Sequence, residues 1–178
     1  MARVSYFDEK QHPELGTLVA KIKAERGGKL LNLYKILLHS PPLVEGWLKL
    51  FTAIRQQCKL HGHYRELAIM RVAVVNGADY EFRAHVPFAL ADGMTQAQID
   101  ALPEWDASSL FDDKERAVLG YTDSMTREIH VPDALFAPLK KHFDEQEQVE
   151  LTATIAGYNL VSRFLEAMQV DHDRPAPV

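Results

Sequence analysis

Apolar residues recur at helical spacing along most of this chain, and the segments that carry them are bounded by helix start and stop signals. Three segments open with a capping box, in which the first side chain caps a backbone N–H and the residue three positions later returns a hydrogen bond. The three boxes pair Thr95 with Gln98, Asp112 with Glu115, and Asp144 with Glu147. Because such punctuation is typical of helices, the chain is expected to be all-α.

Further boundary signals divide the rest of the chain into helices. Gly77 occupies the position of a C-terminal glycine, Asp79 can cap the helix that follows, and Pro87 is expected to kink that helix. The β-branched run from Val72 to Val75 lacks strand punctuation, so no strand is expected there. The expected helices include residues 30–39, a segment that starts at Pro41, residues 63–76 and 79–92, a short helix from Pro132 to near Phe143, and a long one from Glu145 to about Gln169.

The length and the cysteine count limit what the chain can form. Its 178 residues predict a single domain over residues 1–178, with a core over about 30–170 and a frayed tail over 171–178. Cys58 is the only cysteine, so an intramolecular disulfide is impossible and a reducing, cytoplasmic location is expected. The charged N-terminus does not resemble a signal peptide, and no apolar run predicts a membrane span. A net charge of -5 without a clustered basic face argues against nucleic-acid binding.

Candidate proton-transfer residues lie on two neighbouring helices. Glu81 and His85 are four residues apart, so they share one helix face. Glu66 lies on the preceding helix, but its offset from His85 is about five residues, roughly 7 Å along the axis, and simple hairpin geometry does not force contact. A carboxylate that orients an imidazole can support acid/base catalysis near neutral pH. From the residues alone, a structural ion pair is the more frequent use of such a pair.

The loop that contains Cys58, His61 and His63 also carries side chains that can bind metals. A zinc site would need a fourth ligand in suitable geometry, and the sequence signals none. We therefore expect a solvated loop and no metal site there.

Six short segments between about residues 30 and 170 form a pattern that resembles a known family. They are Arg65-Glu66-Leu67-Ala68-Ile69-Met70-Arg71, Tyr80-Glu81-Phe82-x-Ala84-His85, Ala89, Gly93-Met94-Thr95, Glu115-Arg116-Ala117-Val118-Leu119 and Tyr158-Asn159-Leu160-Val161-Ser162-Arg163-Phe164. The pattern is similar to that of the carboxymuconolactone decarboxylase family, which includes the alkyl hydroperoxidase D-like proteins. The last two segments resemble a longer subgroup. The resemblance implies a compact helical bundle and a homo-oligomer built from trimeric units, a trimer or a hexamer.

The peroxidase branch of that family carries a Cys-x-x-Cys-x-x-x-His motif after an upstream glutamate. His85 matches the histidine and Glu66 the glutamate, whereas Ala78 and Glu81 occupy the two cysteine positions. A disulfide-relay peroxidase needs one thiolate to attack the peroxide and a second to resolve the product. Two-cysteine peroxidase chemistry is therefore excluded, and a peroxidase-related function through Cys58 alone is the least favoured hypothesis.

The decarboxylase branch lacks the cysteine pair and uses no metal or organic cofactor. Resemblance to it implies a cofactor-independent lyase that acts on a small carboxylated lactone or related acid. In that hypothesis His85 is the general acid/base, and Glu81 and Glu66 orient it. The candidate substrate-binding residues are Arg71, Arg83 and Tyr80. A non-catalytic oligomeric protein that binds a small acid or a protein partner stays open as the alternative.

Overall fold

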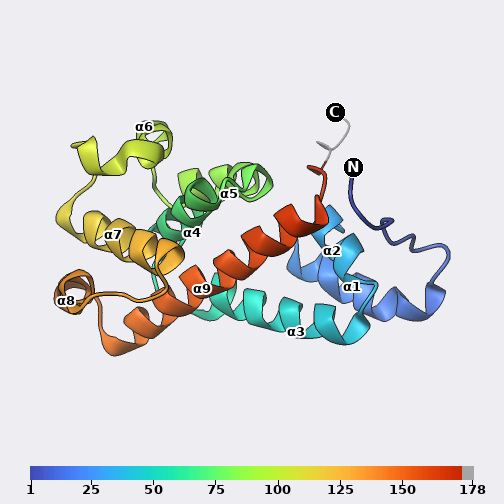
Figure 1. Cartoon of the computed structure of the whole chain (residues 1–178). Coiled ribbons are helices and arrows are strands. Elements are labelled where there is room, and N and C mark those ends of the chain that lie inside the picture. The colour runs from blue at the N-terminus through green and yellow to red at the C-terminus, as the bar shows by residue number, and fades with distance from the viewer. Residues whose placement is uncertain (174–178) are drawn as a thin grey trace. The chain divides into compact units, whose positions relative to one another are not determined.

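The computed structural model describes residues 1–173, and this part of the chain contains helices and no strand (Figure 1). This confirms the predicted all-α fold class. In chain order the elements are η1 (Pro13–Leu15), α1 (Gly16–Glu25), α2 (Asn32–Leu37), α3 (Pro41–Thr52), η2 (Ala53–Gln57), α4 (Gly62–Asn76), α5 (Asp79–Ala91), α6 (Gln96–Ala101), η3 (Leu102–Ala107), α7 (Asp113–Arg127), α8 (Asp133–His142) and α9 (Glu145–Met168).

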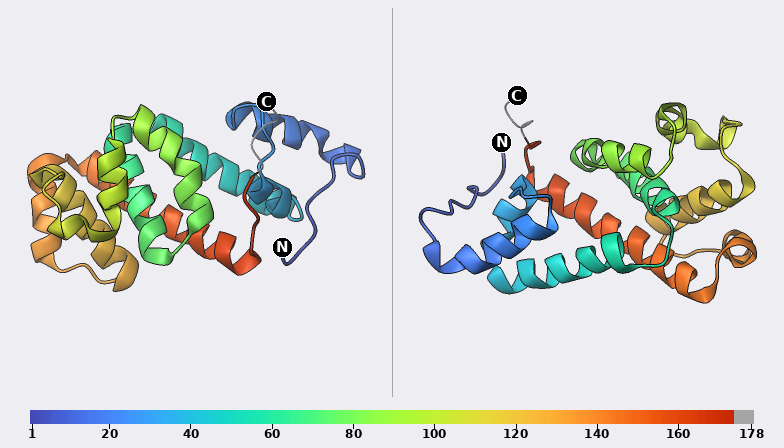
Figure 2. Two further views of the ribbon diagram at one scale, coloured as in Figure 1. Left: turned by 90° about the horizontal axis from the view of Figure 1, so that it is seen from above. Right: turned by 180° about the vertical axis from the view of Figure 1, so that it is seen from behind.

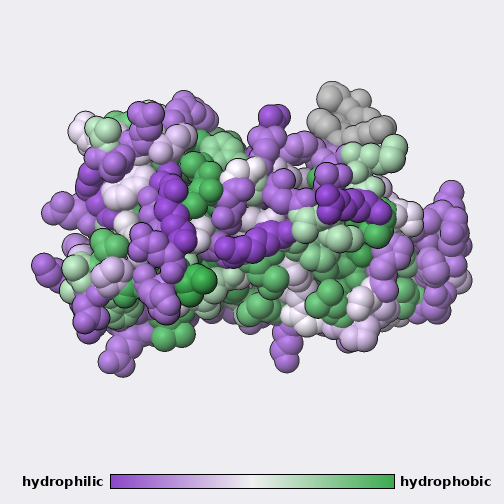
Figure 3. All heavy atoms as spheres, viewed as in Figure 1, coloured by the Kyte–Doolittle hydropathy of each residue, from purple (hydrophilic) through white to green (hydrophobic). Residues whose placement is uncertain are grey.

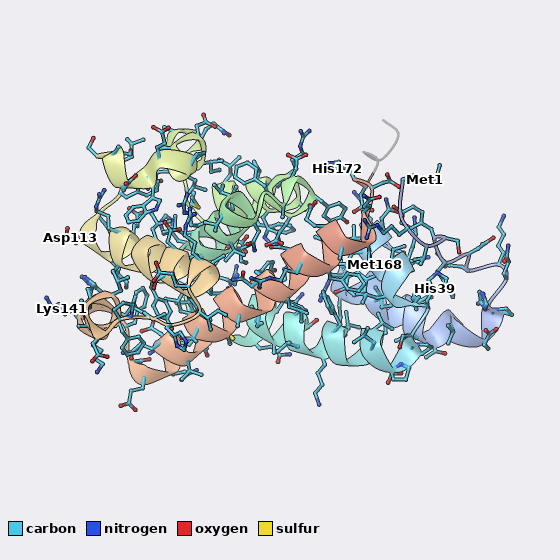
Figure 4. The ribbon with its side chains drawn as sticks, in the orientation of Figure 1. Met1, His39, Asp113, Lys141, Met168 and His172 are labelled. Atoms are coloured by element: carbon cyan, nitrogen blue, oxygen red, sulfur yellow. The ribbon has the colours of Figure 1, made fainter. Side chains whose placement is uncertain are left out.

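The predicted helix boundaries are formed by the side chains that the sequence identified. The boxes at Thr95 and Asp112 are complete, and so is the box at Asp144, where the Glu147 N–H donates to the Asp144 carboxylate at 2.9 Å and the Asp144 N–H donates to the Glu147 carboxylate at 3.0 Å. Gly77 ends α4 with a φ of 64°, a left-handed conformation that glycine adopts without strain. Two charged side chains lie where they interact favourably with a helix dipole. Asp113 is at the start of α7, and Lys141 is near the end of α8 (Figure 4).

Three boundaries differ from the prediction. The N-cap of α5 is Ala78, which has non-helical dihedrals (φ -86°, ψ 80°), and Asp79 is already the first residue of the helix, one position too late to cap it. The same helix runs through Pro87 to Ala91, next to its predicted end at Asp92, and the kink expected at Pro87 stays a prediction. Pro132 is the N-cap of α8 rather than part of its first turn. The helix predicted over residues 30–39 is the shorter α2.

The chain forms two compact units, one from Met1 to Ala53 together with the chain from Leu165 onward, the other from Ile54 to Phe164. In the first unit α2 packs against α3. The Tyr6 hydroxyl donates to the Asp171 carboxylate at 2.9 Å, and the Asn32 N–H donates to Asp173 at 2.7 Å. These bonds hold residues 171–173, where the sequence predicted the start of a frayed tail. Residues 174–178 lie outside the described part of the chain, and the single-domain expectation stays a prediction.

In the second unit α4 is the central helix, and it packs against both α5 and α7 (Figures 1 and 2). Every residue from Glu66 to Ala73 is buried. A helix buried on several sides encloses its polar residues along with its apolar ones, and those polar groups need partners. Glu66 and Arg71 are therefore the two positions on α4 where charge must be compensated inside the unit.

Hydrophilic side chains cover much of the face shown in Figure 3, with apolar side chains between them. Within residues 1–173, no helix is both long enough and apolar enough to cross a membrane. The expected homo-oligomer and cytoplasmic location stay predictions.

Candidate functional site

The turn between α4 and α5 brings Glu66 and His85 into direct contact. The Nδ1 atom of His85 lies 2.6 Å from Oε2 of Glu66. The exposed fractions of the two residues are 1% for Glu66 and 6% for His85, so water hardly competes for this bond. The contact that simple hairpin geometry left open is thus formed, and it places a carboxylate against an imidazole inside the second unit.

Arg65 balances the charge of Glu66 from the other side of the carboxylate. Its Nε donates to Oε1 of Glu66 at 3.1 Å, and its Nη2 donates to Asp92 at 2.8 Å. Burial raises the pKa of Glu66, but the hydrogen bond and charge of His85, together with the charge of Arg65, outweigh burial and hold this pKa below its ordinary value of 4.5. Glu66 is therefore ionised at neutral pH.

An ionised Glu66 selects one tautomer of His85. A carboxylate can only accept hydrogen bonds, so Nδ1 of His85 must carry a proton and donate it. Nε2 is then the ring nitrogen that can exchange a proton with a ligand. Tyr158 packs edge-to-face on the imidazole with ring centroids 5.0 Å apart, and Phe88 lies 5.8 Å away. Burial raises the pKa of Tyr158 far above its usual range, so this residue stays a neutral phenol.

The sequence also predicts that Glu81 orients His85, but the hydrogen bond from Nδ1 goes to Glu66. Glu81 is buried, and its carboxylate accepts a hydrogen bond at 2.7 Å from the hydroxyl of Ser162 on α9. The same hydroxyl lies 2.8 Å from the carbonyl oxygen of Tyr158. Glu81 therefore connects α5 to α9, and the orientation of His85 comes from Glu66.

The two arginines predicted to hold a carboxylate are engaged elsewhere. Arg71 is 4% exposed and donates to both carboxylate oxygens of Asp123 on α7, at 2.5 and 2.7 Å. Arg83 is exposed and pairs with Asp79 one helical turn earlier, at 2.8 Å. Tyr80 is buried on α5. The structure thus brings Glu66 and His85 together, and neither arginine joins them.

A cation that the sequence did not indicate contacts an aromatic ring beside the histidine. Arg55, in the π-helical turn η2, places its guanidinium carbon 4.7 Å from the centroid of the Phe88 ring. Its charge also acts on Tyr158. Phe88 and Tyr158 both flank His85, so Arg55 belongs to the same neighbourhood. No short motif links Arg55 to Phe88, and a π-helical turn has no pattern that would have indicated the contact.

The loop with Cys58, His61 and His63 makes its contacts with residues other than Glu66 and His85. Burial and the nearby charge of Glu150 raise the pKa of Cys58, which keeps the thiol protonated and poorly nucleophilic. The ring of His61 accepts a hydrogen bond from the His63 backbone N–H at 3.2 Å, and the His63 ring lies 2.7 Å from Glu115. These contacts give the loop a structural role at the start of α4.

The lowered pKa of Glu66 predicts a pH-dependent contribution to stability. A carboxylate whose folded-state pKa is depressed stabilises the fold fully above its unfolded-state pKa, and the contribution is lost as the pH falls through the folded-state value. The difference in unfolding free energy between wild type and Glu66→Gln should therefore be largest at pH 7 and shrink as the pH falls below about 4.3. Urea unfolding of both proteins from pH 7 to pH 3 measures it, and a difference independent of pH would contradict the charged pair.

Comparison with known proteins adds a family and a set of similar folds. Residues 41–124 match the model of the carboxymuconolactone decarboxylase family, and this stretch includes Glu66, Glu81 and His85. The uncharacterized protein YdfG of Bacillus subtilis is 29% identical over 115 residues, which cover 64% of this chain and 78% of YdfG.

Two solved structures share the arrangement of helices. A protein of unknown function from Agrobacterium tumefaciens, for which an AhpD role in antioxidant defence has been suggested, is 26% identical with a TM-score of 0.72, over 77% of this chain and 94% of that one. An uncharacterized peroxidase-related protein from Ralstonia eutropha with an alkylhydroperoxidase AhpD core has a TM-score of 0.82 at 16% identity, over 97% of this chain and 92% of that one. The second likeness shows the fold alone.

Proposed function

The chain belongs to the carboxymuconolactone decarboxylase family, with the AhpD-like fold, and from this premise we propose that it is a decarboxylase-type lyase acting on a small carboxylated lactone or related acid. The observation that carries the proposal is the buried bond between Glu66 and His85. Water is excluded from this bond, its carboxylate is ionised, and one ring nitrogen is left for a ligand. This is the arrangement that a general acid/base needs.

The chemistry requires one proton in the right place. Loss of carbon dioxide breaks the bond between the carboxylate carbon and the ring, and the electron pair of that bond becomes an extended enolate. A proton must then be added at the distal carbon of the enolate. In its doubly protonated form His85 delivers that proton from Nε2, becomes neutral, and recovers a proton from solvent. Glu66 stabilises the positive ring through Nδ1 while it is charged.

The resemblance to the peroxidase branch of the family does not imply peroxidase chemistry in this chain. Ala78 and Glu81 stand at the two motif positions where that branch has cysteines, and the raised pKa of Cys58 disfavours a thiolate. A different alternative is favoured by one observation. Arg65 and His85 together satisfy the Glu66 carboxylate, as they would in a structural ion pair, so a small-acid-binding protein without turnover is the second candidate.

A ligand panel with product analysis separates these two candidates. We expect carboxymuconolactone, or another carboxylated lactone in the panel, to raise the melting temperature of the wild-type protein, because a ligand that binds the folded state stabilises it by mass action. The same compound should release carbon dioxide in proportion to enzyme concentration. A shift without carbon dioxide would favour the binding protein, and a panel of lactones and unsaturated diacids with neither effect would contradict the proposal.

A further inference from the structure

Arg55, Phe88 and His85 form a continuous group in the second unit. The Arg55 guanidinium carbon lies 4.7 Å from the centroid of the Phe88 ring, which in turn is 5.8 Å from that of the His85 imidazole. Phe88 is 47% exposed, so part of its ring is accessible to a ligand. The group therefore combines the cation of Arg55 in η2 with the accessible ring of Phe88 and the proton-transfer nitrogen of His85 in α5.

The guanidinium of Arg55 has no acidic partner within residues 1–173, and no hydrogen bond from it is found there. By contrast, Arg65, Arg71 and Arg83 each contact a carboxylate. A cation that stacks on an aromatic ring uses its face for that contact, and its planar edge of N–H donors stays available. The edge of a guanidinium matches the two oxygens of a carboxylate, which makes it a bidentate anion receptor.

We propose that Arg55, held by the Phe88 ring, is the residue that binds a carboxylate of the substrate and sets the reacting carbon against Nε2 of His85. The chemical class is a small, flat, unsaturated dicarboxylate or carboxylated lactone. The assignment rests on the proposed function for the step at His85. It replaces Arg71 and Arg83 as the source of the positive charge.

The carboxylate that Arg55 binds is the one that stays in the product. An ion pair to the departing carboxylate is strongest before the reaction and disappears as neutral carbon dioxide forms, so it would stabilise the substrate more than the transition state. An ion pair to a retained carboxylate keeps its strength throughout and positions the ring. A ligand therefore needs two acidic groups, one for Arg55 and one that reacts.

Calorimetric titration with hexa-2,4-dienedioate and with its monomethyl ester tests the site without any turnover. In the wild-type protein the dianion should bind at least tenfold more tightly than the monoester. Arg55→Met, which keeps an apolar side chain against Phe88, should weaken binding of the dianion about tenfold or more, and Arg55→Lys should recover part of the loss. Lys140→Met is the matched control, since it removes a cation that stacks on Phe136 of α8, and it should bind as the wild type does.

Equal binding of the dianion by wild type and Arg55→Met, or no binding by the wild type, would overturn the assignment. The outcomes for Arg55 and for the lyase reaction can be told apart. Arg55-dependent binding with no release of carbon dioxide from carboxymuconolactone supports the anion site and contradicts the lyase. Carbon dioxide release that is unchanged in KM and kcat by Arg55→Met supports the lyase and contradicts the anion site.

Discussion

Replacing His85 by alanine is expected to lower the rate of carbon dioxide release from carboxymuconolactone by about 10²–10⁴-fold, the usual contribution of a positioned general acid/base. The variant loses Nε2, which we propose as the proton donor to the enolate, while Glu66 keeps its contact with Arg65. The fold should therefore survive, and initial rates measured beside a circular dichroism spectrum separate lost chemistry from lost structure.

Two further variants decide whether proton transfer is what His85 contributes. His85→Asn places an amide N–H where Nδ1 donates to Glu66, so it preserves the buried hydrogen bond and removes the far side of the ring with Nε2; it should be as inactive as the alanine variant. His130→Ala, at an exposed histidine on the turn after α7, should retain wild-type activity. Added imidazole should partly restore the alanine variant. A His85→Asn protein with full activity would remove His85 from the mechanism.

The largest effect on stability is expected at Arg71. Arg71→Met leaves the Asp123 carboxylate without its bidentate partner and deprives the carbonyl oxygens of Leu102 and Pro103 of a donor. Breaking one side of a fully buried ion pair costs about 3–5 kcal/mol, and the loss here should lie toward the lower end of that range, because Asp123 is 22% exposed and keeps some contact with water. Urea unfolding should show this loss as a lower midpoint with an unchanged slope.

Arg83→Met is the matched control for Arg71, since it removes the same charge from an exposed pair that water already screens. Its unfolding midpoint should stay close to that of the wild type. Should Arg71→Met fail to fold, Asp123→Asn gives a second test, because an amide oxygen at the Oδ2 position can still accept from Nη2 of Arg71 and from Trp105, whereas the amide NH2 cannot accept the bond from Nε of Arg71. An Arg71→Met protein as stable as Arg83→Met would show that the pair with Asp123 does not hold α4 to α7.

Local rules predicted the fold well because helix ends are decided by a few neighbouring residues. Thr95 and Asp112 both form their capping boxes, and Gly77 adopts the left-handed conformation that a C-terminal glycine favours. The error at Asp79 has a local cause as well, since Ala78 occupies the non-helical N-cap position after Gly77 and has no polar side chain that could cap the helix.

The site was only partly predictable, because its contacts depend on how helices cross. Axial spacing left the contact between Glu66 and His85 open, and the packing of α4 on α5 formed it. Arg71 could have been recognised as structural, since it stands inside a run of apolar residues and a buried arginine needs a partner. The role of Arg55 could not have been recognised. Its contact with the Phe88 ring joins segments that are far apart in the sequence, and such contacts have no characteristic sequence spacing.

An ionised Glu66 should hold His85 with its proton on Nδ1 and leave Nε2 for the substrate. Nitrogen-15 NMR of the wild-type protein with labelled histidine measures this directly, with the His85→Asn variant to assign the signals. We expect a protonated, hydrogen-bonded Nδ1 at neutral pH, and of the two ring nitrogens only Nε2 should shift strongly when hexa-2,4-dienedioate is added. A proton on Nε2 with an unprotonated Nδ1, or an Nε2 chemical shift that the ligand does not change, would contradict this arrangement of Glu66 and His85.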